Sequence, residues 1–123
     1  MAPLRLVVAA LALAAPAPLK AEPVDQWRPL ISQASARFGV PEDWIVRVMQ
    51  AESRGRPDAL SPKGAMGLMQ LMPGTWADMR AALRLGPDPY DPHDNVVAGA
   101  LYLRQLYNRF GYPGLFAAYN AGP

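Results

Sequence analysis

Apolar residues recur every three or four positions in several stretches of the chain, which is the spacing of one face of an α-helix. One such stretch begins around residues 26–28 and runs to Phe38, and Gly39 after it is a residue that commonly ends helices. The next begins at Pro41, whose two following carboxylates suit the positive end of a helix dipole, and is expected to reach about Ser53. The pattern therefore predicts two amphipathic helices, one after the other.

The rest of the chain alternates between loops rich in glycine and proline and further apolar stretches. Loops are expected at residues 54–65 and 86–89, with a short apolar run at 66–72 between the first loop and the next helix. Further helices are predicted at residues 75–83, capped by Thr75, at 91–110, capped by Asp91, and at 115–121. The aromatic side chains between residues 102 and 119 are expected in the core. No stretch alternates as a strand does, so the predicted fold class is all-α.

One carboxylate lies on a helix face that should be buried. Glu52 shares its face with the apolar residues three, four, seven and eight positions before it, which are Met49, Val48, Ile45 and Trp44. Because apolar surroundings disfavour the ionised form, the pKa of Glu52 should lie above the ordinary glutamate value of about 4.3. A carboxyl of this kind can act as a general acid near neutral pH. The pattern alone also allows a helix-end glutamate turned towards solvent.

The first 21 residues differ in character from the rest. Arg5 lies in a short basic start, and the apolar run 6–15 that follows is too short to cross a bilayer. This pattern predicts a secretory signal peptide over residues 1–21, an exported domain over residues 22–123 and no membrane span after cleavage. Cleavage would remove Arg5 and Lys20, leaving ten basic residues against the 10 acidic ones. A neutral surface lacks the electrostatic footprint of a nucleic-acid-binding protein.

Metal and redox chemistry are restricted by composition, because the chain has no cysteine and one histidine. A disulfide framework, a thiolate metal site and a lipid-anchoring cysteine are excluded. A single histidine, His93, argues against a zinc site or a histidine-dependent triad. Helix capping and loop turns explain the nearby oxygen-rich side chains better than calcium binding does; these are Asp88, Asp91, Asp94 and Asn95. No metal or other cofactor is predicted.

Three segments carry further information in combination: AESRGRPDALSPKGAMGLMQLMPGTW, DPHDNVVAGALYLRQLYNRFG and FAAYNAGP. In this order they resemble the soluble lytic transglycosylase (SLT) family, whose domain is lysozyme-like, from about Phe38 to Pro123. The Glu-Ser pair, GLMQ and AYNAG are the family's signatures. The resemblance implies a small, periplasmic, monomeric enzyme that cleaves the β-1,4 bond between N-acetylmuramic acid and N-acetylglucosamine in peptidoglycan without water, leaving a 1,6-anhydro end. It also implies secretion or conjugation machinery as an expected partner besides the glycan strands.

The resemblance assigns roles to the residues at matching positions. Glu52 matches the family's catalytic acid, and Ser61 and Tyr119 match residues that orient it. Substrate-binding roles are implied for four others, which are Ser53, Gln70, Met72 and Asn120. The first of these could instead simply close the helix that carries Glu52.

The chemistry of a lone acid agrees with this resemblance. Most glycosidases use two carboxylates, and no second one falls within the apolar motifs. One acid suffices if it protonates the glycosidic oxygen and then accepts the proton of the muramic acid C6 hydroxyl as that hydroxyl attacks C1. The alternatives are a goose-type lysozyme-like hydrolase, for which Asp58 is the loop candidate for the second carboxylate, a non-catalytic wall-binding or assembly component, or an inactive fragment. The sequence ends at AYNAGP, where the family continues, so the domain is expected to lack the family's C-terminal helices.

Overall fold

The computed structural model describes residues 23–122 of the 123-residue chain, so the predicted signal peptide lies outside the described residues. Over that range the elements are, in order, η1 (Asp25–Trp27), α2 (Arg28–Phe38), α3 (Glu42–Glu52), α4 (Pro73–Leu83), α5 (Pro92–Phe110) and α6 (Gly114–Ala121). The same residues form no strand, only isolated bridges that pair Met66 with Leu60 and with Leu71. None of the helices described is both long enough and apolar enough to cross a membrane. The all-α prediction is confirmed.

Most helix ends lie where the capping residues predict them. Gly39 ends α2 in the left-handed conformation, with φ of 64°, and the Asp91 side chain caps α5 by accepting a hydrogen bond from the Asp94 N–H at 2.9 Å. The predicted start of α4 was wrong. This helix begins at Pro73, and Thr75 is buried within it instead of capping it. Proline suits the first helical position because its φ is already fixed and the N–H that it lacks would have no partner there.

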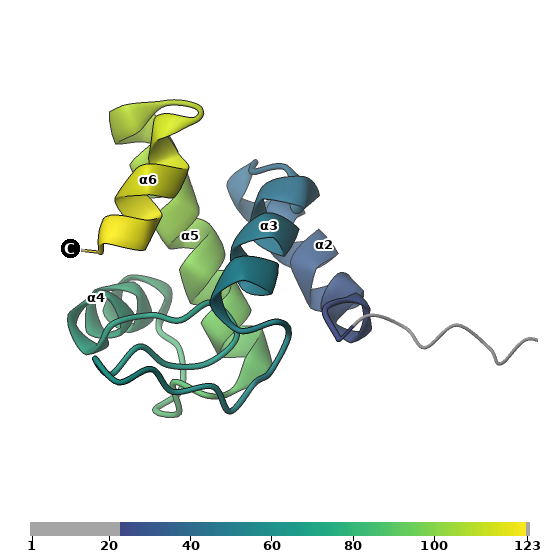
Figure 1. Ribbon diagram of the computed structural model, residues 1–123, viewed down its shortest axis with the longest axis vertical. Coiled ribbons are helices and arrows are strands. Elements are labelled where there is room, and N and C mark those ends of the chain that lie inside the picture. The colour runs from purple at the N-terminus through teal and green to yellow at the C-terminus, as the bar shows by residue number, and fades with distance from the viewer. Residues whose placement is uncertain (1–22, 123) are drawn as a thin grey trace, which may run out of the picture.

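Helix α5 lies at the centre of the fold (Figure 1) and contacts α2, α3, α4 and α6. Its residues 95–100 are all buried. At Gly99 an added Cβ would lie 2.6 Å from Cγ of Met69, closer than carbon atoms can approach without displacement. The glycine therefore lets the loop of residues 53–72, which connects α3 to α4, pack directly against the central helix.

The hydrophobic core includes side chains of this loop as well as of the helices. Its largest fully buried apolar side chains are Ile31, Ile45, Met49, Leu68, Met69, Leu71, Leu103 and Leu115. The prediction that the C-terminal aromatic residues are core residues was wrong for three of them. Tyr107, Phe110 and Tyr112 are 37%, 49% and 62% exposed, because they project from the end of α5 and the turn that follows it.

Candidate functional site

Glu52 is the last residue of α3, at the point where the loop begins. On its helix face Ile45, Val48 and Met49 are buried, as the periodicity predicts, and Glu52 itself is half-buried. Burial raises the pKa of the Glu52 carboxyl above its ordinary value of 4.5. The carboxyl therefore keeps its proton to a higher pH than an exposed glutamate does.

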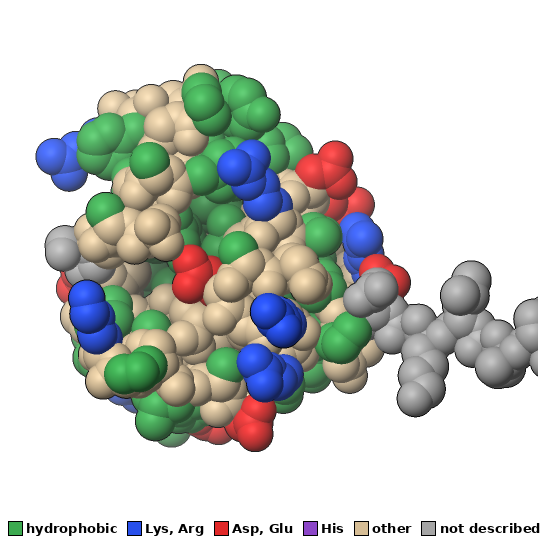
Figure 2. Space-filling view, in the orientation of Figure 1, with side chains coloured by type: hydrophobic (Ala, Val, Ile, Leu, Met, Phe, Trp, Pro, Cys, Tyr) green, Lys and Arg blue, Asp and Glu red, His purple; other side chains and the backbone are tan. Residues whose placement is uncertain are grey.

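Two pockets open beside Glu52 and share Glu52, Tyr119 and Asn120 in their linings. The loop-side pocket, about 270 Å³, lies between α3, α6 and the loop, and its other lining residues are Ser61, Lys63, Ala65, Gln70, Met72, Ala121 and Gly122. The helix-side pocket, about 220 Å³, lies between α3 and α6, and its other lining residues are Arg47, Val48, Ala51 and Phe116. In the space-filling view an acidic side chain lies in a hollow near the centre of the visible face, with lysine or arginine side chains around it (Figure 2).

A larger cavity, about 720 Å³, lies between α5 and α6, where Leu106, Phe110 and Ala118 contribute to its apolar lining. None of the residues that line it is acidic. A pocket without a carboxyl group offers no general acid, so the two smaller pockets around Glu52 are the better candidates for a catalytic site.

Six of the seven site residues predicted from the sequence line the loop-side pocket, and Ser53 does not. The Ser53 side chain is only 2% exposed. Its hydroxyl donates to the Met49 carbonyl at 3.2 Å and accepts from the Gly55 N–H at 3.1 Å. Both bonds are local and both face the protein, so Ser53 closes helix α3, and its predicted contact with substrate is not supported by this position.

Ser61 and Gln70 are held by backbone groups of the loop itself. The Ser61 hydroxyl oxygen accepts a hydrogen bond from the Ala65 N–H at 2.9 Å. The Gln70 side-chain amide donates to the Ala59 and Gly67 carbonyls, each at 2.9 Å. Both Gln70 donors are thus occupied, and its side-chain oxygen is the group left to accept a bond from a molecule in the pocket.

Tyr119, on α6, is buried directly beside Glu52. Its hydroxyl donates to the Met69 carbonyl at 2.6 Å, and its ring lies against that of Tyr102 with centroids 5.2 Å apart. Burial, and secondarily the charges of Glu52 and Tyr102, raise the pKa of Tyr119 well above its ordinary value. Tyr119 is therefore a neutral phenol whose remaining lone pair can accept a hydrogen bond.

Asn95 is a structural determinant of the site that sequence reasoning missed, because it was placed among the capping residues. It is fully buried. Its side-chain oxygen accepts from the Met69 N–H at 2.7 Å, and its amide donates to the Met66 and Pro89 carbonyls at 3.0 and 2.9 Å. A polar residue at the head of the apolar run 96–100 was the available signal, since a buried amide requires partners. Asn95 fastens the loop to α5.

The Transglycosylase SLT domain family matches residues 29–123 of this chain. The chain belongs to this family. It is similar to the transglycosylase of Enterobacteria phage PRD1, with 42% identity over 87 residues that cover 70% of this chain and 31% of the relative. It is also similar to the membrane-bound lytic murein transglycosylase C of Haemophilus influenzae strain PittGG, with 40% identity over 91 residues that cover 69% of this chain and 26% of the relative.

Among solved structures, the chain resembles the lytic transglycosylase Slt of Pseudomonas aeruginosa in an inactive glutamate-to-glutamine mutant. The TM-score is 0.70 at 34% identity, over 78% of this chain and 17% of that one. The predicted family and its lysozyme-like helical fold are confirmed. The SLT domain described here spans less than a third of the length of the curated relatives named above.

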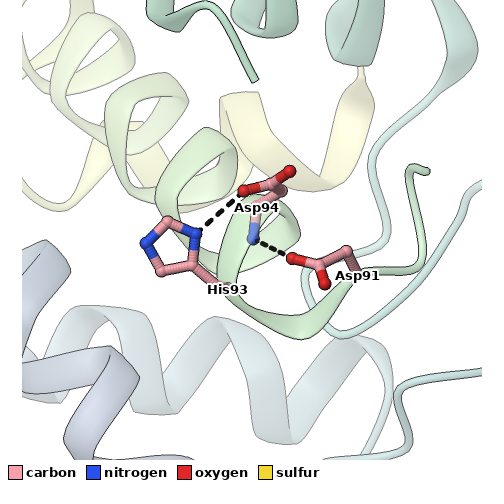
Figure 3. A group of neighbouring side chains, drawn as sticks. All are labelled: Asp91, His93 and Asp94. Carbon is pink, nitrogen blue, oxygen red and sulfur yellow. Dashed lines mark hydrogen bonds and ion pairs between the residues drawn. The ribbon is translucent and has the colours of Figure 1, made fainter. Parts of the chain in front are cut away.

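The SLT domain also brings together Asp91, His93 and Asp94, whose potential metal-ligand atoms lie within 4.8 Å of one another (Figure 3). Asp91 accepts from the Asp94 N–H. Asp94 in turn accepts from the Gly86 N–H at 3.1 Å and contacts His93 Nδ1 at 2.8 Å. Helix capping and attachment of the preceding loop thus account for the positions of both carboxylates.

Proposed function

We propose that this SLT domain is a peptidoglycan lytic transglycosylase that cleaves the β-1,4 bond between N-acetylmuramic acid and N-acetylglucosamine and leaves a 1,6-anhydro end. One observation carries the proposal: Glu52 is the only carboxylate among the described residues that line the two pockets, and burial raises its pKa. A single carboxyl suits a reaction whose nucleophile belongs to the substrate. The names of the relatives, which include lytic murein transglycosylases, support the same reaction class.

In the first step protonated Glu52 gives its proton to the glycosidic oxygen, and the bond from that oxygen to C1 of N-acetylmuramic acid breaks. The C6 hydroxyl oxygen of the same sugar then bonds to C1. Its proton passes to the Glu52 carboxylate, which restores the acid for the next cycle. Because attack within one sugar is intramolecular, proximity can lower the activation free energy by about 7–11 kcal/mol.

The other residues of the loop-side pocket have supporting roles in this proposal. Ser61 and Tyr119 orient the Glu52 carboxyl, Ser61 through its free O–H and Tyr119 through its remaining lone pair, because its own proton is committed to Met69. Three residues contact the sugars: Gln70 through its side-chain oxygen, Met72 through its apolar side chain and Asn120 through its amide.

A hydrolase of the goose type is less well supported. Such an enzyme needs a second carboxylate to position the attacking water. Asp58, the loop carboxylate considered for that role, is exposed and lines neither of the two pockets. Water attack therefore has no candidate base beside Glu52 among the described residues.

The location and partners of the protein stay predictions. We propose export to the periplasm through a signal peptide at residues 1–21, action on peptidoglycan glycan strands as a monomer, and assistance to a secretion or conjugation machine. The support is the sequence pattern of the first 21 residues and the murein substrate in the names of the relatives.

The decisive experiment is the mass of the products that the full-length protein releases from purified peptidoglycan. Anhydro ends are expected, whereas reducing ends, heavier by one water, would establish a hydrolase, and binding without any product would indicate a wall-binding component. Glu52→Gln should lower the rate by about 10²- to 10⁴-fold. Glu42→Gln, at an exposed position in the first turn of the same helix, is the matched control, and its rate should stay within about twofold of the wild-type rate. A Glu52→Gln rate equal to that of the control would refute the assignment of the acid.

A further inference from the structure

The helix-side pocket contains a cation that the proposed reaction does not use. Arg47 and Glu52 both line this pocket, and its apolar lining comes from Val48, Ala51 and Phe116. We propose that the helix-side pocket binds a carboxylate of the lactyl-peptide substituent of muramic acid, with Arg47 as the residue that binds it. This inference rests on the proposed function, since it concerns the same substrate.

Arg47 is held in place by an aromatic platform. Its guanidinium carbon lies 3.9 Å from the centroid of the Phe116 ring. Phe116 in turn lies edge-on to Trp44 and to Tyr112, at 6.0 Å in each case, and these two rings stack on each other at 5.5 Å. A guanidinium that is already positioned loses less side-chain entropy when it binds a ligand.

The stacking leaves the hydrogen-bonding capacity of Arg47 free. Within residues 23–122 the ion pairs are Arg28 with Asp25 and His93 with Asp94, so Arg47 takes part in none, and its side chain donates no hydrogen bond there. Asp43, four residues earlier on α3, does not pair with it. A guanidinium that stacks through its face keeps its N–H groups directed outward in the ring plane, where they match the two oxygens of a carboxylate.

The separation between Arg47 and Glu52 restricts which ligand can contact both residues. Arg47 precedes Glu52 by five residues, which is about 7.5 Å along the helix axis. A ligand that contacts both the Glu52 carboxyl and Arg47 should combine apolar groups, which suit Val48, Ala51 and Phe116, with an anion that pairs with the guanidinium. The N-acetylated sugar backbone is neutral, whereas the substituent on muramic acid carries methyl groups close to the sugar and carboxylates beyond them. The substituent therefore fits this pocket better than a further sugar does.

The test compares two polymers with the full-length protein. One is peptidoglycan whose amino groups are acetylated, and the other is the same material with its carboxyl groups also converted to methylamides. The wild-type protein should show a higher kcat/KM on the carboxylate form, and Arg47→Met should lower the ratio of the two kcat/KM values by about 3- to 10-fold. Raising the ionic strength should lower the wild-type ratio as well.

Arg37→Met is the matched control, because Arg37 also lies over an aromatic ring, that of Phe38 at 5.2 Å, but lines neither pocket. Arg37→Met should leave the ratio of the two kcat/KM values within about twofold of the wild-type ratio. Amidase-treated strands locate the bound group, because the amidase hydrolyses the amide bond to the peptide and leaves a free lactyl carboxylate in its place. Dependence on Arg47 in the untreated polymer assigns a peptide carboxylate, since the lactyl carboxyl is there part of an amide. Dependence that persists in the treated strands means that the pocket also accepts the freed lactyl carboxylate, and its loss there restricts the pocket to peptide carboxylates.

The wild-type protein alone can overturn the inference, whether or not an Arg47 variant folds. Equal kcat/KM on the carboxylate and methylamide polymers, with anhydro ends from both, would contradict only the carboxylate pocket. Absence of anhydro ends from both polymers would contradict the proposed function itself.

Discussion

The Tyr119 hydroxyl donates a hydrogen bond to the carbonyl oxygen of Met69 at 2.6 Å, across 50 residues of sequence. The N–H of Met69 donates to Asn95 on the other side, so one loop residue is bonded to both α6 and α5. Glu52, at the end of α3, directly precedes the same loop. The walls of the loop-side pocket therefore depend on bonds made at a residue that does not line it.

Tyr119→Phe removes the hydroxyl alone and should lower the free energy of unfolding by about 1–3 kcal/mol. The reason is that the carbonyl of Met69, which is fully buried, loses its side-chain partner. Tyr102→Phe is the matched control, because Tyr102 lies against the same ring but its hydroxyl bonds to no described residue. Urea unfolding of both variants measures the difference. Equal stability of the two would mean that the Tyr119–Met69 bond contributes nothing.

Asn95→Ala should be more damaging, with a loss of about 3–5 kcal/mol in the free energy of unfolding. It removes the side-chain hydrogen bonds to three backbone groups, on Met66, Met69 and Pro89, of which the Met66 carbonyl keeps a bond from the Leu71 N–H. Asn108→Ala, at an exposed position on the same helix, should stay within about 0.5 kcal/mol. Thermal unfolding of the two variants is the measurement, and a loss below about 1 kcal/mol at Asn95 would contradict the role given to this residue.

The helices could be predicted from the sequence because their determinants are local. Gly39 and Asp91 act within a few residues of their own positions, and the structure places helix ends at both. The start of α4 was missed because Pro73 and Thr75 are competing start signals two residues apart. Such errors are confined to one turn of helix.

The path of the loop could not be predicted, because it is set by contacts with distant residues. Its position depends on Asn95 and on the close approach of Met69 to Gly99. Gln70 adopts a left-handed conformation, with φ of 50°, that non-glycine residues seldom adopt. Periodicity carries no information about such contacts.

The site itself was partly predictable. The helix face of Glu52 was evident from apolar spacing, and the structure confirms that this face is buried. The binding role proposed for Arg47 could not be predicted from the sequence, because it depends on the stacking of Arg47 on Phe116, a residue of another helix. The catalytic and binding roles drawn from the family resemblance stay predictions.

Ser61→Ala should lower kcat by about 2- to 10-fold and change KM little, because the lost hydroxyl orients Glu52 and does not hold the sugar. Ser35→Ala is the matched control: the Ser35 hydroxyl also bonds a backbone group, the Val40 carbonyl at 2.6 Å, but lies in neither pocket. Both changes remove one side-chain hydrogen bond to the backbone, so both should lower stability modestly, and only the first should slow turnover. A raised KM at unchanged kcat in Ser61→Ala would instead assign Ser61 to substrate binding.

Glu52→Gln should make the protein more stable at neutral pH although it greatly lowers activity. In the unfolded chain Glu52 titrates near 4.5, and in the folded protein burial raises its pKa above that value. Between the two values the folded protein holds a proton that the unfolded chain has released, so the free energy of unfolding of the wild type falls as pH rises through this window. Glutamine does not titrate and escapes this loss. The melting temperature of Glu52→Gln should therefore exceed that of the wild type at pH 7, and the difference should shrink as pH falls towards 4.5.

Glu42→Gln serves as the control and should shift stability in the opposite direction. Glu42 lies in the first turn of α3, where its negative charge interacts favourably with the helix dipole, so its neutralisation should cost about 0.3–1 kcal/mol at neutral pH. Melting curves of both variants and the wild type between pH 4 and 8 make the comparison. A Glu52→Gln protein that is no more stable than the wild type at pH 7 would mean that the Glu52 carboxylate is well solvated, and the argument for a buried general acid would then fail.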